Sequence, residues 1–168
     1  LIGGDDCEIS FRPDGVETGR VIVPDGACST GSIAVSIGHG VLVGSSDETV
    51  VVTPGGDADP LGSPGELVDF DEVAKIWYVA SRGGSMVHGI NADHSPRWSS
   101  EVDGAITALA TELPGGAVIV ASELPDGRAA IWRVDADAGE VTSIGDADRA
   151  VRALSMSPDG SRWALEFH

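Results

Sequence analysis

The chain has 168 residues, of which 42% are hydrophobic, and this is enough for one globular domain with its own core. It carries 27 Asp and Glu residues against 10 Lys and Arg residues, a formal net charge of −17 at pH 7. Such a charge argues against nucleic acid as a partner, because phosphate binding needs clustered cations, and against anionic membrane surfaces. No stretch approaches the ~18 consecutive apolar residues of a membrane-inserted helix.

The first predicted elements are two short strands at residues 8–11 and 20–23, which form a hairpin. The only cysteines, Cys7 and Cys28, flank this hairpin and could form a disulfide. A bridged pair would indicate an extracytoplasmic protein, whereas two free thiols would indicate a cytoplasmic one. Both alternatives remain open from the sequence.

Three segments with four predicted strands each then follow, and two further strands end the chain. The predicted strands are 33–37, 41–45, 50–53 and 60–63; then 67–70, 77–81, 87–90 and 97–100; then 106–110, 118–122, 131–134 and 141–144; and finally 151–156 and 163–167.

The second strand of each segment repeats most clearly. Its copies begin at Val41, Trp77, Val118 and Trp163, so the steps are 36, 41 and 45 residues. Each copy is a nearly continuous apolar run, as expected for a strand covered on both faces. Turns of the form Pro-Asp-Gly or Pro-Gly-Gly separate the strands, because Pro presets φ and Gly accepts a positive φ. A period of about 40 residues with four strands per repeat predicts an all-β fold, a β-propeller of four-stranded antiparallel blades.

We therefore predict one propeller domain over residues 1–168, with about four blades. Three blades are continuous, at about 31–64, 65–103 and 104–148. The strands at the two ends supply complementary halves, so residues 1–26 and 149–168 together could make a composite blade. Two alternatives follow: a closed four-bladed ring, or part of a larger propeller that a second chain or copy completes.

Two stretches resemble a known family of repeats. Residues 151–165 contain Ser157-Pro158-Asp159-Gly160, which is similar to the turn between the first two strands of WD40-like and TolB-type propeller repeats. Residues 131–141 resemble the later part of the same repeats. The chain departs from true WD40 repeats, because no Trp-Asp pair ends a third strand. The resemblance implies a scaffold that binds partners through one rim or through the central opening.

Candidate chemistry is sparse along the chain. Asp135, Asp137 and Gly139 have the spacing of the start of a calcium loop, but a hairpin turn explains the same residues. None of the four histidines has a metal-ligand spacing or a nucleophile motif. Asp69 and Asp71 could act as an acid–base pair, although such pairs arise by chance in an acidic chain. We predict no catalytic residues, no metal and no cofactor.

The leading hypothesis is a non-catalytic propeller scaffold for protein–protein interaction or assembly. The alternative is a propeller-type hydrolase, lyase or ligand-binding protein with an acidic site at the central opening. For a scaffold, the loops after the second and fourth strands share one rim. Trp98 beside Arg97 has the composition of a binding hot spot if it is exposed, and burial at the edge by a neighbouring segment is the alternative. The predicted binding residues are Asp5, Asp6, Asp47, Glu48, Arg82, Trp98, Glu101, Asp126 and Arg149.

Overall fold

The computed structural model contains strands and turns but no helix among the residues it describes. The described residues are 2–3, 7–11, 19–23, 33–36, 39–46, 48–53, 57–157 and 159–167. Strands β1 to β3 are described by their backbone pairing alone.

Three complete sheets form the centre of the molecule, each with four antiparallel strands in sequential order. The first sheet holds β4 (Ile33–Ser36), β5 (Gly40–Gly44), β6 (Thr49–Val52) and β7 (Ala58–Pro60). The second holds β8 (Leu67–Asp71), β9 (Ile76–Ala80), β10 (Met86–Asn91) and β11 (Pro96–Glu101). The third holds β12 (Ala105–Thr111), β13 (Ala117–Glu123), β14 (Ala129–Asp135) and β15 (Val141–Ala147).

Two incomplete sheets flank the complete ones. At the N-terminal side, β1 (Ile2–Gly3), β2 (Cys7–Phe11) and β3 (Gly19–Val23) make a three-stranded sheet. At the C-terminal side, β16 (Val151–Met156) and β17 (Trp163–Phe167) make a two-stranded sheet. We call β16–β17 the half blade, because it holds only the first two of four strands.

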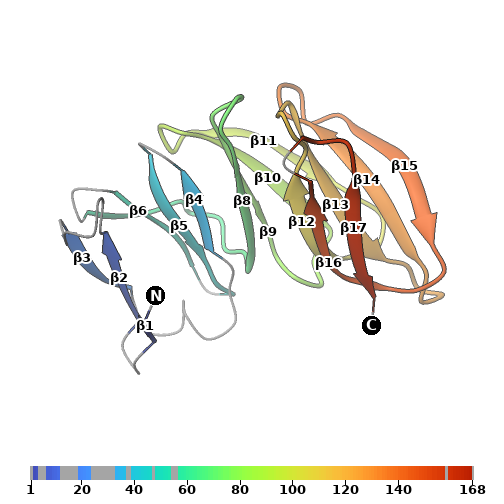
Figure 1. Ribbon diagram of the computed structural model, residues 1–168, viewed down its shortest axis with the longest axis horizontal. Helices are drawn as coiled ribbons and strands as arrows, with labels where there is room; N and C mark the ends of the chain where they lie inside the picture. Colours follow the sequence, from blue (N-terminus) through green and yellow to red (C-terminus); the bar gives the residue numbers. More distant parts are fainter. Residues whose placement is uncertain are drawn as a thin grey trace.

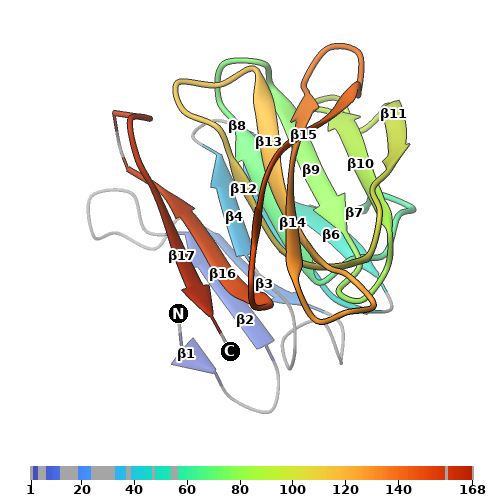
Figure 2. The same ribbon diagram turned by 90° about the vertical axis from the view of Figure 1, so that its right-hand side faces the viewer.

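The first four sheets follow one another in chain order along the long axis of the molecule, and the two-stranded sheet lies beside the third complete sheet (Figure 1). A turned view shows the complete sheets stacked one behind another, as blades are (Figure 2). Their first strands lie on the inner side, where β4 contacts β8, β8 contacts β12, and β12 contacts β16. Each further sheet therefore extends an arc of blades around these inner strands.

Burial explains why the second strand of each blade is an uninterrupted apolar run. Every residue of β5 and β9 is buried, and β9 has a neighbouring sheet on both faces. Trp77 and Val79 pack with the preceding blade, whereas Tyr78 and Ala80 pack with the following one. Alternate side chains of one strand thus belong to two different inter-blade cores, and neither face can be polar.

The all-β propeller fold is confirmed, and fifteen of the sixteen predicted strands are present with small shifts at their ends. The strand predicted at 60–63 is displaced, since β7 is Ala58–Pro60. Strand β1 was not predicted, because two residues carry no periodic pattern. The two end sheets lie apart in Figure 1 and are not hydrogen-bonded to each other among the described residues. The pairing of the two halves into a composite blade therefore stays a prediction.

The turn between β16 and β17 gives a prediction about acid. The carboxylate of Asp159 accepts hydrogen bonds from the Ser157 hydroxyl at 2.6 Å and from the Ser161 amide at 3.1 Å and hydroxyl at 2.8 Å. These bonds lower the pKa of Asp159 to about 2, with the Ser157 hydroxyl as the largest cause. Since the folded pKa lies below the unfolded value of about 3.9, the stabilisation is present above pH ~4 and is lost as the pH falls through 2.

The measurement is a carbon-detected NMR titration of the Asp159 carboxyl between pH 6 and 1.5. We expect its midpoint clearly below that of exposed carboxylates in the same spectrum. In a Ser157→Ala variant, the midpoint should move upward toward the ordinary value of about 3.9. A wild-type midpoint near that ordinary value would contradict the turn geometry.

Candidate functional site

One rim of the molecule gathers the loops that follow the second and fourth strands. The amide of Gly65 donates to the carbonyl of Ser45 at 2.9 Å, and the Ser81 hydroxyl donates to the carbonyl of Pro64 at 3.1 Å. The Ser122 hydroxyl donates in the same way to the carbonyl of Asp103. Hydrogen bonds therefore connect the ends of second strands to the loops that follow fourth strands. Together these segments form one continuous surface.

Most of the predicted binding residues that the structure describes lie on this rim. Glu48, Arg82, Glu101, Asp126 and Arg149 are exposed there. Their neighbours are mostly local: Glu101 accepts from the Ser85 hydroxyl, and Asp126 pairs with Arg128 at 2.8 Å. Asp5, Asp6 and Asp47 lie outside the described residues, as does Cys28. A binding role for the rim residues, and the disulfide, stay predictions.

Trp98 lies on an outer strand and is half-buried by the neighbouring blade. Its indole N–H donates to the carbonyl of Ala136 at 2.8 Å, and its ring is half-buried against Gly139 of the following blade. Gly139 has φ +68, and a Cβ there would lie 2.9 Å from the Trp98 ring. Arg97 pairs with Asp137 at 2.5 Å in the same seam. Trp98 therefore joins two blades at their outer edge.

Asp69 and Asp71 also join blades. Asp69 accepts from the amide of Thr111 at 2.7 Å, and Asp71 accepts from the amide of Gly116 at 2.7 Å. Both donors belong to the next blade. Burial, with the nearby Asp71 charge, raises the pKa of Tyr78, whose hydroxyl is 3.4 Å from Asp71. Each carboxylate accepts a hydrogen bond from a backbone amide that the next blade holds in place, which suits a structural role.

The calcium-like spacing at Asp135 is a hairpin turn. Its carboxylate accepts from the amides of Asp137 and Ala138, both at 2.9 Å, and the Ala138 bond is the main cause that lowers the Asp135 pKa. His88, on β10, contacts the Ser99 hydroxyl at 2.8 Å, and burial lowers its pKa. Among the described residues, no three His, Cys, Asp or Glu side chains gather closely enough to hold a metal ion.

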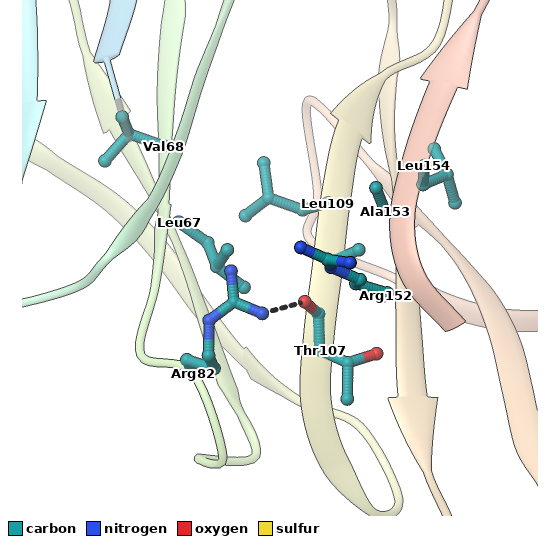
Figure 3. Close-up of a pocket in the computed structure, with 9 residues that line it drawn as sticks. Leu67, Val68, Arg82, Thr107, Leu109, Arg152, Ala153 and Leu154 are labelled. Atoms are coloured by element: carbon teal, nitrogen blue, oxygen red, sulfur yellow. Dashed lines mark hydrogen bonds between the residues drawn. The ribbon is translucent and has the colours of Figure 1, made fainter. Parts of the chain in front are cut away.

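The inner strands enclose a groove with a cationic end. It has a volume of about 160 Å³ and lies between β8, β12 and β16. Arg82 and Arg152 both reach into it, and an Nη of Arg82 donates to the carbonyl of Thr107 at 2.9 Å (Figure 3). The alternative hypothesis placed an acidic site at the central opening, and these described residues do not favour it. Arg152 was not among the binding residues predicted from the sequence. An arginine within an inner strand of a strongly acidic chain was the signal that could have indicated it.

The described architecture defines an all-β protein of the propeller type. Among solved structures, the chain is similar to Kuenenia stuttgartiensis hydrazine synthase, with a TM-score of 0.70 and 17% identity over 79% of this chain and 40% of that one. It is also similar to a chain of the mitotic checkpoint complex, with a TM-score of 0.68 and 15% identity over 93% of this chain and 51% of that one. At these identities the likeness concerns the fold.

The sequence comparisons add no family. No family model matches the chain, and no curated protein matches it. The chain spans about half the length, or less, of the two solved chains named above. Among the described residues, no helix is long and apolar enough to cross a bilayer.

Proposed function

We propose that this protein is a propeller-type scaffold for assembly, and that a second copy of the chain completes its half blade. One observation carries the proposal. A strand position that is wholly buried in the complete blades is exposed in the half blade: Trp77 of β9 is 0% exposed, whereas Trp163 at the matching place in β17 is 39% exposed.

The contrast extends along the whole strand. β9 and β5 are buried at every residue, but four of the five residues of β17 are exposed. Phe167 is 39% exposed and is covered in part by the Arg149 guanidinium, 5.5 Å from the ring centroid. Large exposed aromatic side chains on a sheet face are typical of surfaces that associate with another protein.

The outer edge of β17 supports the same proposal. Among the described residues, β17 pairs only with β16, so its other edge presents unpaired N–H and C=O groups. A two-stranded sheet is marginal in water, and an open edge accepts an added strand through main-chain hydrogen bonds. In each complete blade, this edge of the second strand is occupied by a third strand.

The same chain contains the strands that are missing here. β2 and β3 occupy the third and fourth places of the N-terminal sheet, where β1 supplies only two residues of a second strand. Two copies could exchange these halves at both of their ends. Three complete blades and one composite blade from each copy would make a ring of about eight blades, within the usual range for propellers.

The test is the mass of the chain in solution, measured by sedimentation equilibrium over a wide concentration range. We expect a dimer of twice 17.2 kDa, with the amides of β17 protected from hydrogen exchange. A double variant, Trp163→Ser with Phe167→Ser, should dimerise at least about tenfold more weakly, since each substitution removes a largely apolar contact. Ile144→Ser is the matched control, because Ile144 is 40% exposed on β15, away from the half blade.

Three results would contradict the proposal. The first is a mass of 17.2 kDa at every concentration. The second is an Ile144→Ser variant that dissociates as readily as the double variant. The third is protection of β17 in a monomer, which would mean that the two ends of one chain pair with each other.

A further inference from the structure

The groove at the inner strands combines two cations with apolar walls. Arg82 enters it from the loop between β9 and β10, and Arg152 enters it from β16 (Figure 3). Leu67, Leu109 and Leu154 line the same space. The two arginines come from different blades, so only the stacking of the blades brings them together.

The arginine end of the groove carries positive side chains, although the protein as a whole is strongly negative. The chain has only 10 Lys and Arg residues against 27 Asp and Glu residues, yet two arginines share one groove. Among the described residues, the guanidinium of Arg82 donates to the carbonyl of Thr107, a neutral acceptor, while the Arg82 backbone amide donates to the Glu66 carboxylate at 2.8 Å. Arg152 lies 3.5 Å from Glu166, where both side chains are more than half exposed, so this ion pair is weak. Within the part of the chain that the structure describes, the remaining guanidinium N–H groups have no hydrogen-bond partner and are available to a ligand.

The apolar part continues beyond the arginines. A second groove of about 400 Å³ follows the same inner strands and shares Val68, Leu109 and Leu154 with the first. Leu113 and Met156 extend its wall. Asp69, Thr111 and Ser155 also line this second groove, so its surface is mixed. A ligand with an anionic end at the arginines would therefore find its apolar contacts at Leu109 and Leu154, which both grooves share.

We propose that this groove binds an organic monocarboxylate, with the carboxylate between Arg82 and Arg152 and an aliphatic chain along Leu109 and Leu154. Guanidinium groups match the two oxygens of a carboxylate in charge and geometry. A net charge of −17 disfavours multiply charged anions such as phosphate, which also offer nothing to the leucines. The site does not depend on pairing of the half blade.

The experiment uses hexanoate as the probe, titrated into the full chain with ¹⁵N-labelled arginine. We expect saturable shifts of two arginine Nε–H signals, which Arg82→Gln and Arg152→Gln assign. Each variant should weaken binding about tenfold or more, the scale expected for a lost charge-assisted hydrogen bond. Arg128→Gln is the matched control, because Arg128 is an exposed arginine paired with Asp126 outside the groove. Glu166→Gln should strengthen binding, since it removes the anion that competes for Arg152.

Three further probes complete the test. Acetate should bind more weakly than hexanoate, hexanol should leave the two arginine signals in place, and inorganic phosphate should bind more weakly than hexanoate. Thermal unfolding of each variant checks that it is folded. The proposal is overturned if hexanoate binding does not saturate, if Arg152→Gln behaves as Arg128→Gln does, or if phosphate binds as tightly as hexanoate.

Discussion

Replacing Asp71 with alanine is expected to lower the free energy of unfolding by about 3–5 kcal/mol. The side chain is 0% exposed, and its oxygens accept from the amides of Val73 and Ala74 at 2.8 Å and of Gly116 at 2.7 Å. Alanine would remove the acceptor of three backbone N–H groups, of which those of half-buried Ala74 and Gly116 are shielded most from water. An N–H group left without a partner costs about 1–3 kcal/mol where it is buried. Urea unfolding followed by tryptophan fluorescence measures the change.

Asp69→Ala is the control, because Asp69 lies two residues away on β8 and also bonds to the next blade. It is only half-buried and accepts from two amides, those of Phe70 and Thr111. The expected loss is about 1–2 kcal/mol. If both variants lost the same free energy of unfolding, the burial of Asp71 would not explain how much its hydrogen bonds stabilise the fold.

The second large effect is expected from Trp77→Ala, with a loss of about 3–5 kcal/mol. Trp77 is 0% exposed, and its ring centroid lies 4.1 Å from that of Phe70. Truncation opens a cavity between two blades that the surrounding backbone cannot fill. The comparison is Trp163→Ala, at the same place in the half blade, where we expect about 1 kcal/mol or less for the monomeric chain. Denaturant unfolding at low protein concentration measures both.

Trp77→Phe separates volume from hydrogen bonding at the same site. Among the described residues, the indole N–H of Trp77 has no hydrogen-bond partner. Phenylalanine should therefore cost less than alanine, since it removes an unsatisfied donor and keeps most of the ring. Equal losses for Trp77→Ala and Trp163→Ala would mean that the half blade packs as the complete blades do, and the proposed assembly surface would then be absent.

The functional residues show where reasoning from sequence stops. The rim was predictable, because antiparallel strands of known order place their alternate loops at one end. The position of Trp98 was not, since the partner of its indole N–H is Ala136, 38 residues later on another blade. The groove was missed for the same reason: Arg82 and Arg152 are 70 positions apart, and only the contact of β12 with β16 and β8 joins their surroundings.

The sequence by itself determined the all-β fold, the strands and most of their turns. This information is local: apolar runs mark strands covered on both faces, and Pro and Gly residues mark the corners between them. Gly127 and Gly160 have φ of +82 and +69 at two of the predicted turns. The tertiary structure alone decided which carboxylates hydrogen-bond to a neighbouring blade. It also decided that the described end sheets are separate and that two arginines line the same groove at the inner strands. Each of these depends on how blades stack, and stacking brings together residues whose separation along the chain leaves no pattern to read.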